Sequence, residues 1–202
     1  MKNQFICFEG ASGTGKTTQI ALLKKKLDSL GLINVVYLRE PGTTEMGETI
    51  RYLLKSSTDL DAYTRLFLYT AARAELVNKQ ILPALSTGKI IICDRYIPSS
   101  VVYQSYWPEL SKDFIRSINI NFPKPDLTIL LDGSKLIDTR GNIISEAGPD
   151  LDYINKNYIE EYNHAIENGE NWIIVDSARA IKKVQNQILD KVLEFLNIQD
   201  KY

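Results

Sequence analysis

A short run of residues near the start of the chain has the composition and spacing to hold phosphate groups. The run is Gly10, Ala11, Ser12, Gly13, Thr14, Gly15, Lys16 and Thr17, with Thr18 directly after it. It matches the phosphate-loop pattern G-x-x-x-x-G-K-[ST] in full. In such a loop, backbone N–H groups converge on the phosphates, Lys16 neutralises the β- and γ-oxygens, and Thr17 offers a hydroxyl group to Mg²⁺. The pattern predicts a site for a nucleoside triphosphate.

The residues on either side of this loop support the match. Residues 5–8 form an apolar run that predicts a buried strand, and residues 17–30 predict a helix with Leu23 and Leu27 on one side. A chance turn rich in glycine and threonine is the alternative, and such a turn would not require these flanks. A strand, a glycine-rich turn and a helix N-terminus together form an anion trap.

A second group of polar residues follows the apolar run at residues 90–93. Asp94 and Arg95 come directly after that run. A carboxylate at the end of a buried strand can hold the magnesium shell, directly or through water, and an adjoining arginine can fork onto a phosphate. A local salt bridge explains the bare pair equally well, so the functional interpretation needs support from other segments.

Apolar runs alternate with helical patterns along the rest of the chain. The predicted strands are residues 5–8, 33–38, 90–93, 127–131 and 172–175. The predicted helices are residues 17–30, 48–54, 64–85, 111–118, 151–168 and 180–196. The strands are rich in Val, Ile and Leu without clean alternation, as expected of parallel strands covered on both faces. This order predicts a three-layer α/β domain whose ligands gather beyond the carboxyl ends of the strands.

Length and composition place few further limits on function. The 202 residues, 44% of them hydrophobic and 24% charged, predict one domain covering residues 1–202. A formal net charge of −1 gives no overall attraction to nucleic acid or to a membrane surface. The first strand and the loop begin almost at once and no apolar run has the length of a membrane span, so we expect no signal peptide and a soluble, cytoplasmic protein. Cys7 and Cys93 lie in apolar runs and are expected to be core residues.

A phosphate loop alone does not separate kinases, GTPases and motor ATPases. A GTPase would need the guanine-reading pattern N-K-x-D, which residues 78–81 and 155–158 both fail to complete. The pattern D-x-x-G at residues 138–141 does not directly follow a strand, and for so short a pattern we interpret it as coincidence.

Three further segments, taken with the loop and the Asp94–Arg95 stretch, closely resemble the thymidylate kinase family. They are residues 39–43 (Arg-Glu-Pro-Gly-Thr), 47–51 (Gly-Glu-Thr-Ile-Arg) and 66–73 (Leu-Phe-Leu-Tyr-Thr-Ala-Ala-Arg). The likeness runs in order from about residue 4 to residue 132, and it returns more weakly at residues 151–162 and 175–177. It implies a three-layer P-loop kinase fold with a five-stranded parallel sheet and a short lid. It also implies transfer of the γ-phosphoryl group of ATP to dTMP with Mg²⁺, usually by a homodimer.

The resemblance implies which residues meet the acceptor nucleotide. The set is Glu40, Pro41, Arg51, Tyr69, Arg73, Arg95, Ser99, Ser100, Tyr103 and Gln104. Arg73 would bond the thymine carbonyl edge and Tyr69 would stack on the pyrimidine. Residues four apart on a helix share a face, so this ring and this guanidinium can address the same base, although core packing is the alternative for Tyr69. Pro41 would shape the pocket wall, and Glu40 would belong to the polar network near the site.

The rest of that set would surround the base, sugar and phosphate of the acceptor. Ser100 and Gln104 would line the base pocket, and Tyr103 would crowd the sugar and disfavour a ribose 2′-hydroxyl. Arg51 and Arg95 would grip the acceptor phosphate. Phosphoryl transfer asks mainly for in-line positioning of two anions and for neutralisation of their charge, which such arginines would supply.

The same likeness assigns residues to the donor. Lys16 and Mg²⁺ would hold the phosphates of ATP, with Thr17 and Asp94 as the metal residues. Arg179 follows the last predicted strand, where this family's base-flanking loop lies. It would stack on the adenine or, equally, be a solvated arginine at a helix entry.

The chain departs from the family pattern at two places. Members usually carry an acidic residue at the position of Ser12, and some place an arginine next, where this chain has Gly13. Members without that arginine usually carry arginines in the lid, but here the lid, residues 132–150, offers Lys135 and Arg140. Three explanations stay open. Arg140 alone serves as the catalytic lid arginine, or the chain is a slow or divergent kinase for another deoxynucleotide, or it has lost catalysis and kept nucleotide binding.

Overall fold

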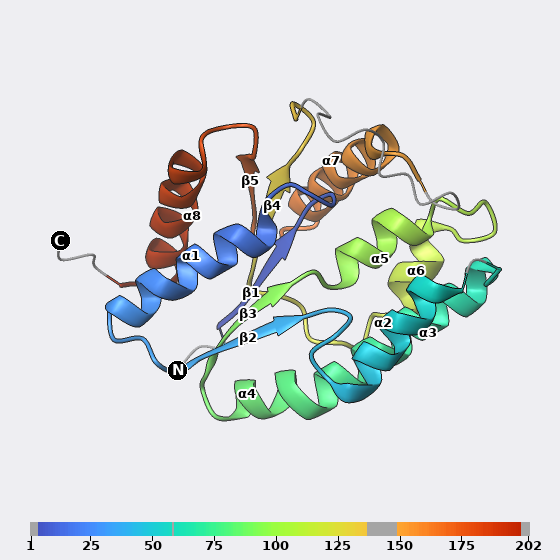
Figure 1. Ribbon diagram of the computed structural model, residues 1–202, viewed down its shortest axis with the longest axis horizontal. Coiled ribbons are helices and arrows are strands. Elements are labelled where there is room, and N and C mark those ends of the chain that lie inside the picture. Colours follow the sequence, from blue (N-terminus) through green and yellow to red (C-terminus); the bar gives the residue numbers. More distant parts are fainter. Residues whose placement is uncertain (1–3, 58, 137–148, 199–202) are drawn as a thin grey trace.

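The computed structural model describes residues 4–57, 59–136 and 149–198, which form a three-layer α/β fold (Figure 1). The middle layer is a parallel sheet of five strands in the order β2-β3-β1-β4-β5. The strands are β1 Gln4–Glu9, β2 Val35–Arg39, β3 Ile90–Asp94, β4 Leu127–Asp132 and β5 Trp172–Asp176. The predicted fold class is confirmed.

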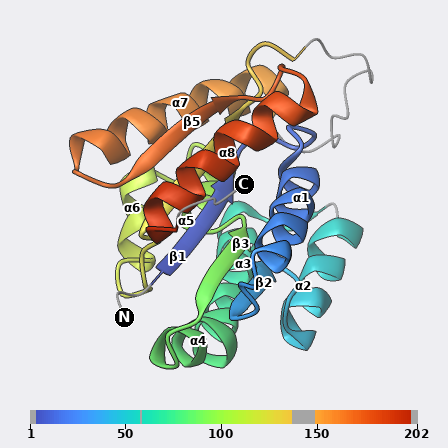
Figure 2. The same cartoon turned by 90° about the vertical axis from the view of Figure 1, so that its left-hand side faces the viewer.

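Helices cover both faces of this sheet. They are α1 Lys16–Ser29, α2 Glu45–Ser56, α3 Ala62–Leu76, α4 Leu82–Ser86, α5 Ile97–Gln104, α6 Lys112–Ile118, α7 Leu151–Glu167 and α8 Ile181–Leu196, with a π-helix, Val77–Ile81, between α3 and α4. The helices α1 and α8 cover one face and lie in front of the sheet in Figure 2, whereas α3, α4, α5 and α7 cover the other. Within the described ranges, no helix is long and apolar enough to cross a membrane.

The central strand β1 explains why the apolar runs show no alternation. Its side chains at Ile6 and Phe8 pack with α1 and α8, while Phe5 and Cys7 pack on the opposite face. Because both faces are covered, every position from Phe5 to Phe8 is apolar, and the polar residues Gln4 and Glu9 stand at the two ends of the strand. Cys7 and its register partner Cys93 are buried free thiols, which confirms their expected place in the core.

Several predicted boundaries are wrong by two or three residues, and the starts of β2 and α2 are examples. The second strand starts at Val35, two residues later than predicted, and Ile33 is 89% exposed. Helix α2 starts at Glu45, three residues earlier than predicted, because the Thr44 side chain caps it by accepting a hydrogen bond from the Gly47 N–H.

The helical segment after α2 differs more from its prediction. The single helix expected at residues 64–85 contains the π-helix, in which the N–H of Leu82 donates to the carbonyl of Val77, five residues back. Pro83 follows at once, and because proline lacks an N–H and crowds the preceding turn, a wider turn there lets the helix continue. Helix α5 was not predicted at all, although it carries several candidate site residues.

Candidate active site

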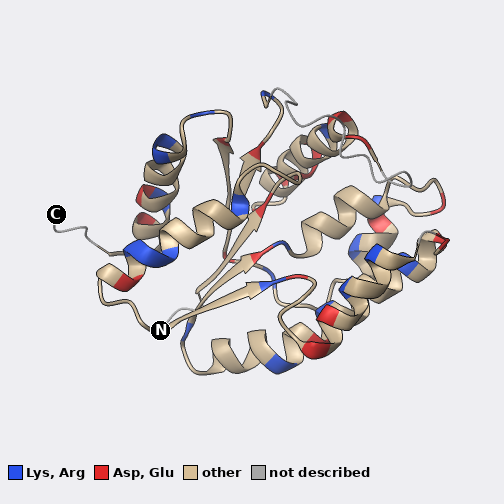
Figure 3. Ribbon diagram, in the orientation of Figure 1, with Lys and Arg blue, Asp and Glu red and all other residues tan. Residues whose placement is uncertain are grey.

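The candidate site lies where the carboxyl ends of the strands meet. Four strands end in an acidic residue, Glu9, Asp94, Asp132 and Asp176, along one edge of the sheet (Figure 3). Beside this edge is a cavity of about 640 Å³. The predicted residues that line it are Ser12, Gly13, Gly15, Lys16, Thr17, Thr18, Glu40, Pro41, Arg51, Tyr69, Arg73, Asp94, Arg95, Ser99, Ser100, Tyr103 and Gln104. The fold therefore brings together site residues from segments that are far apart in the chain.

The phosphate loop turns between β1 and α1 on glycines with left-handed backbone conformations. The φ angle is 135° at Gly10, 85° at Gly13 and 90° at Gly15, values that residues with a side chain rarely adopt. A Cβ atom at Gly10 would also collide with the backbone oxygen of Leu131. The loop thus requires glycine where the phosphate pattern has it.

Lys16 folds back over this loop. Its Nζ donates to the carbonyl oxygens of Gly10 and Ala11, at 2.7 Å in each case. Burial, helped by the positive charge of Arg95, lowers the pKa of Lys16 to about 7. The ammonium group thus sits in surroundings that lack a full countercharge, which favours the binding of an anion.

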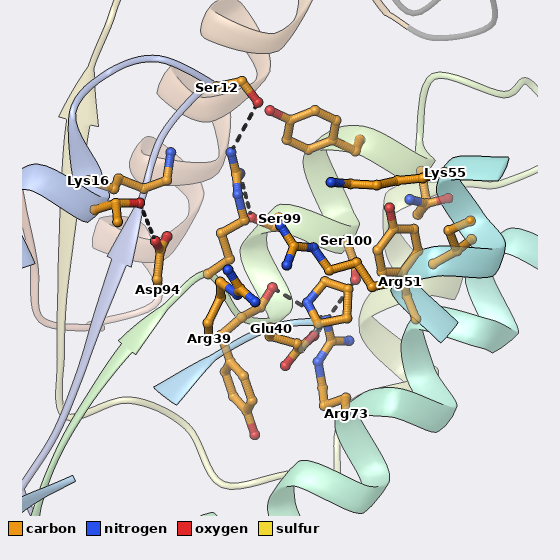
Figure 4. A pocket seen from close by; sticks show the side chains of 18 of the residues that line it. Ser12, Lys16, Arg39, Glu40, Arg51, Lys55, Arg73, Asp94, Ser99 and Ser100 are labelled. Carbon is orange, nitrogen blue, oxygen red and sulfur yellow. Dashed lines mark hydrogen bonds and ion pairs between the residues drawn. The ribbon is translucent and has the colours of Figure 1, made fainter. Parts of the chain in front are cut away.

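Thr17 and Asp94 meet across the space between α1 and β3. The Thr17 hydroxyl donates to Oδ2 of Asp94 at 3.0 Å, and Oδ1 of Asp94 is buried with no hydrogen-bond partner among the described residues (Figure 4). A hydroxyl and a carboxylate are hard oxygen donors of the kind that Mg²⁺ takes, often with water completing its shell. The pair therefore fits the predicted metal position.

Arg95 has a left-handed backbone, with φ of 72°, and extends into the cavity. Its Nη1 donates to the Ser99 and Tyr158 hydroxyls at 3.1 Å each, and its Nη2 donates to the Ser12 hydroxyl at 3.4 Å. The guanidinium also lies over the Tyr103 ring, 5.3 Å from its centroid. These hydrogen-bond partners are neutral hydroxyl groups, which do not neutralise the positive charge of Arg95. The guanidinium can therefore still bind an anion.

Glu9 organises the groups around Arg95, and the sequence did not predict it as a site residue. Its Oε1 accepts from the Tyr96 N–H at 2.7 Å, and its Oε2 accepts from the Ser99 and Tyr158 hydroxyls at 2.7 and 3.0 Å. Burial raises the pKa of Glu9, and the charge of Arg95 opposes that rise. One carboxylate thus joins β1 to the start of α5 and to α7.

Arg73 is 1% exposed and bonded to groups from several elements. It forms an ion pair with Glu40 and donates to Oδ1 of Asn119 at 2.6 Å and to the Ser100 hydroxyl at 2.7 Å. Burial raises the pKa of Glu40 to about 7, against the lowering effect of Arg73. The Oε2 atom of Glu40 and the Nε atom of Arg73 have no partner among the described residues. The network fixes Arg73 in the cavity wall.

Tyr69, Pro41 and Gln104 complete this end of the cavity. Tyr69 packs against the core cluster of Ile50, Leu54 and Ala72 and also lines the cavity, so the structure leaves both interpretations of this ring open. The Gln104 Oε1 atom and the Tyr103 hydroxyl are buried and lack partners in the described part of the chain. Buried polar atoms without partners are uncommon in folded proteins, and beside a cavity such atoms can form hydrogen bonds with a polar ligand or with water.

Basic side chains from β2 and α2 line the mouth of the cavity. Arg39 and Arg51 share one carboxylate, that of Glu48, with N–O distances of 2.5 and 3.6 Å. Lys55 lies one helical turn after Arg51 and lines the same cavity. Together with Arg95, these residues make this part of the cavity strongly positive.

A smaller hollow of about 200 Å³ lies beyond the phosphate loop. Its lining residues are Gly13, Thr14, Gly15, Thr18, Gln19, Ser177, Arg179, Ile181 and Val184. Arg179 is exposed and lies 3.8 Å from Asp176 in an ion pair, so it borders the hollow without filling it. The predicted lid arginine, Arg140, lies outside the described residues, and Lys135 pairs with Asp176 at 3.1 Å.

Several residues of the site could not be found from the sequence. Glu9 stands beside the phosphate loop, and a buried acid next to that loop was the one available signal. Asn119 and Tyr158 carry no local signal, because they reach the site from chain positions 46 and 63 residues away from Arg73 and Arg95. Lys55 resembles any exposed lysine at the end of a helix.

Comparisons with known proteins all lead to one family, and each covers most of this chain. A family model described as thymidylate kinase matches residues 8–188. The thymidylate kinase of Pelotomaculum thermopropionicum is 36% identical over 211 residues, covering 98% of this chain and 96% of the relative, and that of Exiguobacterium sibiricum is 34% identical over 212 residues, covering 100% and 99%. The crystal structure of thymidylate kinase from Ehrlichia chaffeensis superposes with a TM-score of 0.74 and 31% identity, covering 95% of this chain and 98% of that one. The resemblance seen in the motifs thus extends to sequence and fold together, and the chain belongs to the thymidylate kinase family.

Proposed function

We propose that the cavity transfers the γ-phosphoryl group of ATP to dTMP, giving ADP and dTDP, and that the single domain of residues 1–202 carries the whole reaction. The observation that carries this proposal is the placement of two phosphate-binding groups on one cavity. Lys16 and Thr17 line it from the phosphate loop, and Arg51 and Arg95 line it from α2 and from the end of β3. We assign the first pair to the phosphates of the donor and the second pair to the phosphate of the acceptor. An arrangement of this kind suits in-line transfer between two anions.

On the donor side, the loop amides and Lys16 bind the phosphates of ATP. Thr17 and Asp94 would hold Mg²⁺, which supplies charge neutralisation at the phosphoryl oxygens. The partnerless Oδ1 atom of Asp94 supports this assignment. The adenine lies over the smaller hollow, where Arg179 is placed to stack on it.

On the acceptor side, Tyr69 and Arg73 receive the thymine. The Ser100 hydroxyl and the Gln104 amide lie at the same end of the cavity, where they add hydrogen bonds to the base. The Tyr103 ring borders the sugar and leaves no room for a 2′-hydroxyl group. These roles rest on the likeness to the family and on the cavity lining.

The acceptor phosphate lies between Arg51 and Arg95. One of its oxygens attacks the γ-phosphorus of ATP as the bond from that phosphorus to the bridging β,γ-oxygen breaks. Arg95 stabilises the charge that both phosphates bring to one place, and Arg140 adds to it from the lid segment. Ser12 offers Arg95 a neutral hydroxyl, so the guanidinium keeps its charge for the phosphate.

We further propose that the protein works as a homodimer through α2 and α3. These helices contact each other and carry exposed apolar side chains, among them Leu53 at 40%, Tyr63 at 43% and Phe67 at 51%. Apolar side chains gathered on neighbouring helices are typical of a protein–protein contact.

A coupled assay of ADP release with Mg·ATP tests the reaction. The acceptors are dTMP, dUMP, dCMP, dGMP, dAMP, UMP and thymidine, and Lys16→Ala protein serves as the control for contaminating ATPase activity. We expect fast turnover with dTMP and little with the others. Faster turnover with another acceptor would show that Ser12 marks a changed specificity. The absence of turnover in protein that binds ATP would contradict the proposal.

A further inference from the structure

The basic side chains that line the main cavity differ in one respect, namely whether another group of the protein accepts a hydrogen bond from them. Lys16 is bonded to backbone carbonyls, Arg73 to Glu40, and Arg95 to hydroxyl groups. Arg39 and Arg51 share Glu48. Each of these side chains is held in place before any ligand binds.

Lys55 lines the same cavity without such a partner. Within the described part of the chain, it makes no hydrogen bond and no ion pair within 4.0 Å. Figure 4 shows its side chain extending from α2 toward the middle of the cavity, as the side chain of Arg51 does. An ammonium group directed into a cavity and lacking a carboxylate is suited to bind an anion.

The position of Lys55 on α2 indicates which anion it can bind. Lys55 and Arg51 are four residues apart on α2, so they share a face of the helix with about 5–6 Å between their Cβ atoms. Two long side chains at that spacing can reach oxygens of a single phosphate group. The donor phosphates belong to the loop around Lys16, on the other side of the cavity, which leaves the acceptor phosphate for the pair on α2.

We propose that Lys55 is a specificity-determining residue that binds the phosphate of the acceptor nucleotide beside Arg51 and Arg95. This inference rests on the proposed placement of the acceptor. Lys55 supplies a charge that Glu48 does not share, whereas Arg51 has part of its charge compensated. It therefore favours a nucleoside monophosphate over the nucleoside without a phosphate.

The test compares Lys55→Met with wild type in two measurements, the KM for dTMP and the competitive inhibition constant of thymidine. We expect the KM for dTMP to rise about tenfold, the scale of one charge-assisted hydrogen bond, with kcat little changed. Thymidine has no phosphate, so its inhibition constant should stay the same. Lys55→Arg, which keeps the charge, should recover most of the affinity for dTMP.

Lys25→Met is the matched control, because Lys25 is an exposed lysine on α1 that does not line the cavity. An unchanged KM for dTMP in Lys55→Met would overturn the inference. An equal rise in the KM for dTMP and in the inhibition constant of thymidine would also overturn it, since Lys55 would then contact the base or sugar. Failure of the wild-type protein to use dTMP would instead contradict the proposed function.

Discussion

The ammonium group of Lys16 is destabilised by its surroundings before any nucleotide binds. Burial and the charge of Arg95 lower the pKa of Lys16 to about 7, and its contacts at Nζ are carbonyl oxygens of the loop. Phosphate groups placed against it would reverse this effect and raise the pKa, because an adjacent anion favours the charged form. The binding of ATP and the protonation of Lys16 should therefore be coupled.

We predict that the protein takes up a proton when it binds ATP above neutral pH. At about pH 8, ATP is fully ionised and Lys16 in the free protein is mostly neutral, so uptake should approach about one proton per ATP. The affinity for ATP should fall as pH rises from about 7, by up to about tenfold per pH unit. Calorimetric titrations in two buffers with different ionisation enthalpies measure the uptake directly.

Lys16→Arg is the control for this coupling. A guanidinium stays protonated at these pH values, so ATP binding to the variant should take up no proton. A binding heat that does not depend on the buffer in the wild-type protein would contradict the assignment to Lys16.

How far single residues can be predicted from the sequence depends on where their partners lie. Lys16, Thr17 and the glycines of the loop act within one short segment, so a local pattern identified them. Arg73 and Ser100 were assigned by likeness to a family, and their contact crosses 27 residues of the chain. Tyr158 reaches Glu9 across 149 residues, a distance over which no local pattern operates.

At the level of elements, one buried carboxylate connects the start of α5 to β1 and α7. Glu9 accepts the N–H of Tyr96, the residue just before the helix, and the hydroxyl of Ser99 within its first turn. The same carboxylate accepts the hydroxyl of Tyr158 on α7. Since Ser99 and Tyr158 also receive hydrogen bonds from Arg95, Glu9 sets the position of that guanidinium indirectly.

We predict that Glu9→Gln lowers kcat/KM for dTMP by about tenfold while the melting temperature falls by only a few degrees. The amide keeps the shape of the carboxylate but removes the charge and one acceptor, so Ser99 and Tyr158 must reorient. The affinity for ATP should change little, because the loop amides do not depend on this contact. Steady-state kinetics and thermal melting provide both measurements.

Glu161→Gln is a matched control for that variant. Glu161 is also a buried carboxylate, on α7, but its partner is Arg116 and it does not line the cavity. It should lose stability without losing kcat/KM. Equal kinetic losses in the two variants would show that Glu9 acts through general stability and not through Arg95.

Some elements were predicted from the sequence and others were not, and the two groups differ in what stabilises them. Buried strands such as β3 carry their own signal, since all of their side chains are apolar or terminal acids. Helix α5 has eight residues, with proline near its start and serines in its first turn, so its intrinsic preference is weak. Contacts from Glu9 and the core hold it, and such tertiary contacts leave no periodic pattern.

The order of strands places the whole site. β1 lies between β3 and β4, so the phosphate loop after β1 opens directly beside Asp94 and Arg95, which follow β3. The connection after β1 runs to β2 through α1 on one face of the sheet, whereas the connection after β3 crosses to β4 and begins with α5 on the other face. Parallel α/β folds bind ligands where neighbouring strands connect in opposite directions in this way. Strand β2, next to β3, leads into α2, which brings Arg51 and Lys55 to the same cavity.

In the proposed dimer, the helices at the contact would be the same helices that carry part of the site. Helix α2 supplies Arg51, helix α3 supplies Tyr69 and Arg73, and the exposed apolar side chains lie on these same two helices. Tyr63 contacts both Phe67 and Phe114 through its ring, at centroid distances of 6.3 and 6.1 Å, so the apolar surface continues beyond α3. Contact with a second copy would hold α2 and α3 in position for the acceptor.

We predict that Phe67→Asp separates the dimer and weakens the binding of dTMP more than that of ATP. The aspartate would be a buried and unpaired charge at the contact, which strongly disfavours association. The binding of ATP should change less, because the phosphate loop does not lie on α2 or α3. Light scattering after gel filtration should give twice the chain mass for wild type and the single mass for the variant. Ile120→Asp, at a residue that is 72% exposed and outside α2 and α3, makes the same chemical change as a control and should leave the mass unchanged. A wild-type protein that remains a single chain at every concentration tested would exclude the dimer, and the acceptor site would then have to be complete within one chain.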